Sequence, residues 1–215
     1  MAKHFVSNKD ESARIFKSDF LEFFSKVHWL TPIALYAPFV IYLLYYSFAR
    51  VGFWNPIGLF GAGLFFWTFT EYVLHRFVFH YEPKRDWARR AHWTFHGVHH
   101  DYPQDSKRLV MPPAVSLPLA ALFYVLFDSL LGFYTPPFLA GFLTGYVAYD
   151  TLHYALHHFS FKSGAMLELK KHHMKHHYSD PQQGFGVSSA LWDFAFGTFS
   201  GEKKMRQARE EADKD

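Results

Sequence analysis

Four long stretches of this sequence contain no Asp, Glu, Lys, Arg or His. They cover residues 29–49, 51–70, 109–127 and 129–149, and each is 19 to 21 residues long. A helix needs about 20 apolar residues to cross about 30 Å of hydrocarbon, so each stretch is long enough to span a bilayer. Short turns with Gly and Pro separate the two members of each pair. The pattern predicts an all-α integral membrane protein with four transmembrane helices in two hairpins.

The basic residues fall almost entirely on one side of these predicted spans. Of the 22 Lys and Arg, only Arg50 lies in a turn inside a hairpin. The others lie in the N-terminal segment, in residues 76–108, or from Lys162 onward. With four spans these three regions share one side, and the positive-inside bias makes that side cytosolic. A soluble bundle of very apolar helices is the alternative, and the mean hydropathy of −0.09 is compatible with it.

We expect three parts along the chain. Residues 1–30 form a cytosolic or interfacial segment, residues 31–200 the membrane domain, and residues 201–215 a charged tail. Residues 13–28 carry Phe at helical spacing, which fits either an amphipathic helix on the membrane surface or a helix packed within the domain. The N-terminus lacks the apolar core of a signal peptide, so the first span should be retained. The net charge of +3 gives no argument for nucleic acid as a partner.

The 15 His are clustered, and the absence of Cys leaves imidazole and oxygen as metal ligands. Ten of them are ligand candidates: His75, His80, His96, His99, His100, His153, His157, His173, His176 and His177. Residues three or four apart share a helix face, so most of these spacings place several rings together. His75 and His80 are five apart, which suits a loosened helix end or two different metals.

Topology should bring the four clusters together. Two clusters end the second and fourth spans, which extend past their uncharged cores, and the other two follow in cytosolic segments. We therefore expect a cytosolic helical cap that holds the His. Ten imidazoles exceed the roughly four to six ligands of one transition metal, which indicates a dimetal site.

Other His are interpreted differently. His4 and His28 are expected to be ordinary polar residues, and His92, His158 and His172 lie beside clusters but off their spacing. A His-rich tract can also scavenge metal weakly, but such a tract is contiguous and disordered. The clusters here are separated and attached to apolar helices.

Four segments resemble the fatty acid hydroxylase branch of the sterol desaturase and hydroxylase superfamily. They are EYVLHRFVFH (71–80), FHGVHHDYPQDSKRLVMPP (95–113), GYVAYDTLHYALHH (145–158) and KKHHMKHHYSDPQQGFGVSSALWD (170–193). RLVMPP and GFGVSSALWD favour the fatty acid 2-hydroxylases that act on sphingolipid acyl chains. The resemblance covers roughly residues 55–197 and implies that the ten His are the metal ligands.

The resemblance also implies residues beside the metals. Tyr149 and Asp150 match family positions next to the site and are the candidate catalytic residues. Asp150 lies one turn before a ligand and is placed to accept its ring N–H. Glu71 is expected either to do the same or to form a salt bridge with Arg76 or Arg108.

The implied chemistry is hydroxylation of a membrane lipid at C2 of a fatty acid or ceramide acyl group. Two iron ions would use O₂ and two external electrons, and zinc can occupy such a site in purified protein. Eukaryotic relatives commonly carry a cytochrome b5-like domain. This chain has no haem motif, so we expect a separate electron donor, a ferredoxin or a b5-like protein. The short form suggests a bacterial inner membrane, or the endoplasmic reticulum if the source is eukaryotic.

Three alternatives remain open from the sequence. A desaturase, or a sterol or carotenoid oxygenase, would use the same His site on another substrate. A membrane metal transporter would carry ionisable residues in mid-span, and the four uncharged stretches lack them. A metal-stabilised scaffold would need no vacant coordination position.

Overall fold

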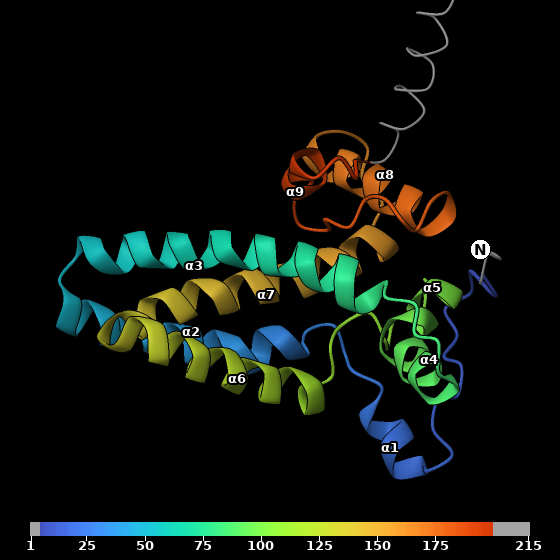
Figure 1. Ribbon diagram of the computed structural model, residues 1–215, viewed down its shortest axis with the longest axis horizontal. Helices are drawn as coiled ribbons and strands as arrows, with labels where there is room; N and C mark the ends of the chain where they lie inside the picture. Colours follow the sequence, from blue (N-terminus) through green and yellow to red (C-terminus); the bar gives the residue numbers. More distant parts are fainter. Residues whose placement is uncertain (1–4, 200–215) are drawn as a thin grey trace, which may run out of the picture.

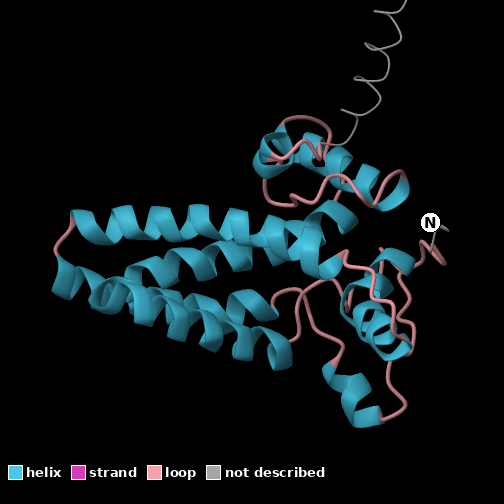
Figure 2. Cartoon of the chain, viewed as in Figure 1, coloured by secondary structure: helices cyan, strands magenta, loops and turns pink. Residues whose placement is uncertain are grey.

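The computed structural model describes residues 5–199, and this range contains helices and loops but no strand (Figure 2). Four long helices lie side by side: α2 (Thr31–Val51), α3 (Trp54–Val73), α6 (Pro113–Leu131) and α7 (Thr135–His158) (Figure 1). Shorter helices gather at one end of this bundle: α1 (Asp19–Phe24), α4 (Asp86–His92), α5 (Val98–Asp101), α8 (Ala165–Tyr178) and α9 (Leu191–Ala195). The predicted all-α class is confirmed for these residues. His4 and the predicted charged tail lie outside them.

Three helical runs are long and apolar enough to cross a membrane. They are Thr31–Arg50, Trp54–Phe79 and Pro113–His158. The third run has 46 residues and contains α6, the 3-10 turn Gly132–Tyr134 and α7, which fold back on each other (Figure 1). Large apolar side chains point outward from these helices; Ile41 is 66% exposed and Leu130 is 72% exposed. These runs indicate an integral membrane protein.

Local sequence signals explain where the long helices begin and turn. Pro32, Pro113 and Pro136 lie in the first turns of α2, α6 and α7, where the missing N–H costs no helical hydrogen bond. Gly52 and Gly132 follow α2 and α6 with positive φ, a conformation that other residues rarely adopt. Both hairpin turns therefore fall where the sequence places them.

Helices α3 and α7 pack with their backbones almost in contact. A Cβ on Gly63 would lie 2.0 Å from the carbonyl oxygen of Phe138, and one on Gly141 would lie 1.9 Å from that of Phe60. Small residues allow this approach, which matters among membrane helices because lipid gives no hydrophobic drive for association. The pair fixes the position of the His that end both helices.

The N-terminal segment differs from the prediction of one helix over residues 13–28. Only α1 is helical there, and it begins late because the Glu22 carboxylate accepts the backbone N–H of Ile15 at 3.0 Å and of Phe16 at 3.1 Å. The same carboxylate pairs with Arg108 at 2.5 Å. Burial by itself would raise the pKa of Glu22, but the N–H donors of Phe16 and Ile15 outweigh it and lower the pKa to about 2.

Both sequence interpretations of this segment hold in part. Ile15 and Val27 are buried against the rest of the chain, whereas Phe20 and Phe23 are 70% and 73% exposed. The segment is therefore anchored at its ends and presents aromatic side chains outward from α1, as an interfacial helix does.

Replacement of Gly141 tests the close helix contact. We expect Gly141→Leu to destabilise the protein by at least about 1–3 kcal/mol, because the new side chain collides with the backbone at Phe60. Thermal unfolding of the purified protein in detergent measures the effect. Gly58→Leu is the matched control on α3, since a Cβ there meets nothing within 4 Å. Equal unfolding midpoints for the two variants would contradict the packing described.

Candidate metal centre

Ten imidazole rings converge at the end of the helical bundle in two groups. The first group contains His75, His80, His96, His100 and His176, and the second contains His99, His153, His157, His173 and His177. Within each group the candidate ligand atoms all lie within 4.8 Å of one another, so each group can hold a metal ion. The structure thus brings together all ten residues predicted as ligands.

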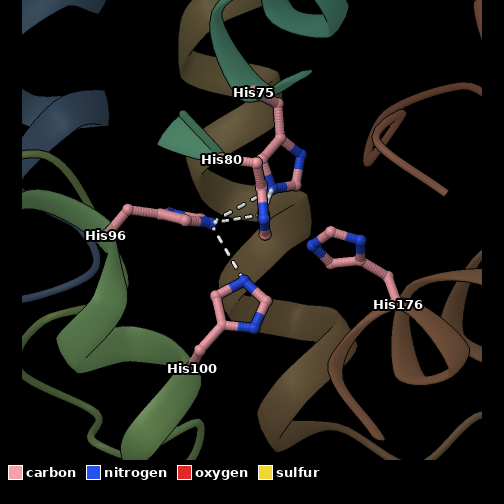
Figure 3. Close-up of side chains that lie close together, drawn as sticks. All are labelled: His75, His80, His96, His100 and His176. Atoms are coloured by element: carbon pink, nitrogen blue, oxygen red, sulfur yellow. Dashed lines mark hydrogen bonds between the residues drawn. The ribbon is translucent and has the colours of Figure 1, made fainter. Parts of the chain in front are cut away.

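A widened helical turn explains the unusual spacing of His75 and His80. After α3 the chain continues as a π-helix over Leu74–Phe79, and the N–H of His80 donates to the carbonyl of His75 at 3.1 Å. A π-turn makes hydrogen bonds five residues apart, so it brings side chains with that spacing to one face. Both rings therefore join the first group, as a loosened helix end predicts, rather than two different metals (Figure 3).

A single shared helix face predicts that each run of three His serves one group, but the structure divides both runs between the groups. The two runs are His96, His99 and His100, and His173, His176 and His177. His96 and His100 join the first group, whereas His99 joins the second. The run on α8 is divided in the opposite sense, with only its middle member, His176, in the first group. The residues at positions i+3 and i+4 follow each other in sequence, and their side chains point about 100° apart around the helix. They therefore reach different groups. Both runs consequently link the two groups, and the rings of His100 and His177 stack at 4.3 Å.

The contacts between ring nitrogens fit a shared cation. In the first group His75 Nε2 lies 3.2 Å from Nε2 of both His80 and His96 (Figure 3). Its Nδ1 faces the carbonyl oxygen of Phe185 at 2.5 Å, so in the neutral ring Nδ1–H donates there and Nε2 carries a lone pair. A ring proton satisfies one nitrogen–nitrogen contact, whereas a central cation accepts every lone pair at once.

Distances in the second group lead to the same conclusion. His173 Nε2 lies 2.9 Å from Nε2 of His157 and 3.1 Å from that of His177. Two nitrogens bound at 2.0–2.1 Å and at a right angle on one metal are about 3 Å apart. The donor set is entirely imidazole, which suits iron, copper, nickel or zinc.

The protein environment keeps these rings in the form that binds metal. Burial, together with the neighbouring imidazoles, lowers the pKa of His100 to about 3. Burial likewise holds the pKa values of His99 and His173 well below the ordinary value, with His153 and His157 adding to the effect. A neutral imidazole is the species that coordinates a metal.

The other His within residues 5–199 lie outside both groups. His92 donates to a backbone carbonyl, His158 stacks on a tyrosine ring, and His172 pairs with a buried carboxylate. His28 accepts a backbone N–H at the start of α2. These residues keep the ordinary polar or structural roles that their spacing suggests.

The acidic residues near the site have partners other than those predicted. The Asp150 carboxylate accepts the N–H of Met111 at 3.2 Å, and no hydrogen bond within the described residues joins it to a ligand ring. Glu71 accepts the N–H groups of Val187 and Ser188, so its predicted pairing with a ligand ring, Arg76 or Arg108 is wrong. Tyr149 is buried, and its ring stacks on His153 with 5.7 Å between centroids.

Sequence reasoning missed the role of the loop over residues 183–189. Carbonyl oxygens of Gln183 and Phe185 accept the Nδ1–H groups of His176 and His75, which are both ligand candidates. From the sequence, the segment GFGVSSALWD indicates only the family resemblance. Its two closely spaced Gly were the signal, because they allow a backbone to approach its neighbours closely.

A cavity of about 260 Å³ lies beside both His groups and is reached by His96, His99 and His153. Its remaining wall is mostly apolar: Ile15, Phe16, Leu21, Phe24, Phe79, Phe95, Val98, Leu109, Val110, Met111, Pro112, Ala114, Val115 and Leu119. The polar groups of the wall come from Ser25, Thr94, Arg108, Tyr149 and Asp150. An apolar cavity with a few converging polar groups is the usual form of a site for an apolar ligand.

Comparisons with known proteins agree on one family. The profile of the fatty acid hydroxylase family matches residues 60–198. The dihydroceramide fatty acyl 2-hydroxylase FAH2 of Arabidopsis thaliana is 42% identical over 195 residues, which cover 90% of this chain and 82% of the relative. The fatty acid 2-hydroxylase of Mus musculus is 39% identical over 208 residues; the match covers 86% of this chain and 56% of the mouse protein.

A solved structure gives the same result for the fold. It is described as full-length scs7p with only the hydroxylase domain visible, and it superposes with a TM-score of 0.81 at 41% identity. The superposition covers 86% of this chain and 71% of the other.

The two groups predict separate effects of ligand removal. His96→Ala and His157→Ala, one from each group, should each lower the metal content from about two ions per chain toward one, because each removes a ring from a different centre. Elemental analysis of the purified protein measures this. His158→Ala is the control beside the second group and should keep the wild-type content. An unchanged metal content in both ligand variants would contradict the assignment.

Proposed function

This chain belongs to the fatty acid hydroxylase family, and from that premise we propose that it is a membrane two-metal oxygenase that hydroxylates a lipid acyl chain at C2. One observation carries the proposal: both His groups border the same apolar cavity. Insertion of oxygen into an alkyl C–H bond needs an oxidant that no side chain supplies. The site combines a metal-binding donor set with a compartment for the chain to be oxidised.

Iron is the metal that we assign to the two His groups. A bound pair of iron ions supplies the activation of O₂ and the oxidation of the C–H bond, with electrons from outside the chain. Imidazole sites bind Zn²⁺ more tightly than Fe²⁺, so zinc in purified protein is compatible with this assignment. The fit between donor set and metal supports a metal centre of either composition.

The chain's own residues position the substrate. The apolar wall formed by α6 and the N-terminal segment binds hydrocarbon and keeps water from the reacting carbon. Tyr149 and Asp150 lie where the cavity meets His153, and we assign them to orienting the polar end of the acyl group. Such positioning decides which C–H bond faces the metals.

The acceptor is assigned from the relatives. FAH2 is named as a dihydroceramide fatty acyl 2-hydroxylase, which supports a sphingolipid acyl group as substrate and C2 as the carbon modified. None of these relatives favours the alternatives raised by the sequence. Those alternatives are a desaturase, a sterol or carotenoid oxygenase, and a metal transporter.

The membrane arrangement is proposed from charge and fold together. We assign four spans, α2, α3, α6 and α7, with the shorter helices as a cap on the cytosolic side. Lys84, Arg89, Lys107 and Lys175 come from the segments at the His-bearing end, which supports that orientation by the positive-inside bias. Electrons then come from a separate cytosolic donor, a ferredoxin or a b5-like protein. The proposed location is a bacterial inner membrane, or the endoplasmic reticulum if the source is eukaryotic.

Lipid analysis of cells tests the function. Cells that express the chain should contain acyl lipids heavier by one oxygen atom, and fragmentation should place the hydroxyl at C2. His173→Ala should abolish the product, because the variant loses a ring of the second group. His28→Ala, a change outside both groups, should retain it. Unchanged lipids together with altered cellular metal content would instead indicate transport.

The cavity makes a second prediction, about substrate fit. Ala114→Phe places a ring where the wall has a methyl group, so hydroxylation of long acyl chains should fall by roughly tenfold or more. Metal content should stay at the wild-type value, because the substitution changes none of the ten His. The ratio of hydroxylated to unmodified lipid and elemental analysis measure the two quantities. Wild-type turnover in this variant would argue against the cavity as the acyl site.

A further inference from the structure

The loop over residues 183–189 contacts ligand rings of the first His group through its backbone. The carbonyl of Gln183 accepts the Nδ1–H of His176 at 2.7 Å, and that of Phe185 accepts the Nδ1–H of His75 at 2.5 Å. An imidazole whose Nδ1–H is bound to a carbonyl has a fixed tautomer and a fixed ring direction, and it presents Nε2 to a metal. Both rings that the loop orients belong to one group.

Two buried carboxylates hold this loop in place. Glu71, near the end of α3, accepts the N–H groups of Val187 at 2.6 Å and Ser188 at 2.9 Å, and also the Ser188 hydroxyl. Asp193, on α9, accepts the N–H groups of Phe185 at 2.9 Å and Gly186 at 2.8 Å. Glu71 is 3% exposed and Asp193 is fully buried. Hydrogen bonds from N–H to a buried carboxylate are strong, so they fix the loop backbone.

The path of the loop also depends on glycine. Gly184 has a φ of +74°, and a Cβ on Gly186 would lie 2.0 Å from the carbonyl oxygen of Ser189 and 2.9 Å from a carboxylate oxygen of Asp193. A side chain at Gly186 therefore forces the loop away from Asp193. The carbonyls that orient the two rings move with it.

We propose that Glu71 and Asp193, through this loop, are positioning residues for the first metal site. They fix the loop, the loop carbonyls fix the rings of His75 and His176, and those rings aim Nε2 at the metal. The two metal sites are consequently unequal, and only the first depends on the loop. The inference rests on the proposed two-metal centre and adds residues that touch neither metal nor substrate.

Metal titration of the purified full chain tests the proposal, with Co²⁺ alone as the probe and a chelator as competitor. The wild type should show two binding steps. Glu71→Ala and Gly186→Ala should each weaken one step by about 10- to 100-fold and leave the other unchanged. Gly186→Ala removes no polar group, so it still tests the loop if Glu71→Ala does not fold.

Conservative variants separate positioning from general damage. Glu71→Gln keeps an oxygen for the N–H groups of Val187 and Ser188 and should restore the weakened step. Asp193→Asn should instead weaken the same binding step. Both carboxylate oxygens of Asp193 already face N–H or O–H donors, and the new amide adds a further donor. Glu168→Ala, an exposed change on the helix that carries His176, is the control and should match the wild type.

The outcomes are distinct. Selective weakening of one step in Glu71→Ala and Gly186→Ala supports the proposal. Two unchanged steps, or equal weakening of both, in the folded variants overturns it while the two-metal centre stands. Fewer than two steps in the wild type overturns the two-metal centre and this inference with it.

Discussion

Mutual proximity of ten buried or half-buried, neutral imidazole rings is the constraint on which the rest of the structure depends. Nε2 atoms in both groups lie about 3 Å apart, as ligands of one metal do. Such an arrangement is favourable only when cations accept the lone pairs, since buried nitrogens without partners are costly. A metal held by these rings would couple its binding to folding, because the candidate ligands come from segments that meet only in the folded chain.

The close packing of α3 against α7 positions the helix ends that carry several of these rings. Gly63 and Gly141 let the two backbones approach, so the His at the ends of both helices emerge next to each other. The π-turn after α3 then rotates His75 and His80 to one side. A separation of the two helices by even one side chain would move rings from both groups, which links a packing feature of the bundle to the geometry of the metal centre.

The site has two halves with different physical demands. The His groups need their rings held in fixed directions, and carbonyls of the loop over residues 183–189 hold two of the rings. The adjoining cavity needs an apolar wall, which α6 and the N-terminal segment supply. Arg108 belongs to both the cavity wall and the buried ion pair with Glu22, so the same contact that anchors the N-terminal segment also closes one side of the cavity.

The sequence by itself determined the helical class, the positions of the hairpin turns, the ten clustered His and the family, because these follow from local composition and spacing. Tertiary structure alone decided how the ten rings divide into two groups, since that depends on how each helix is rotated against its neighbours. It also decided the partners of Glu71 and Asp150 and the shortness of α1. Spacing along a helix predicts which residues share a face, but a carboxylate such as Glu22 can hold the preceding residues out of the helix when it accepts their backbone N–H groups and pairs with the distant Arg108.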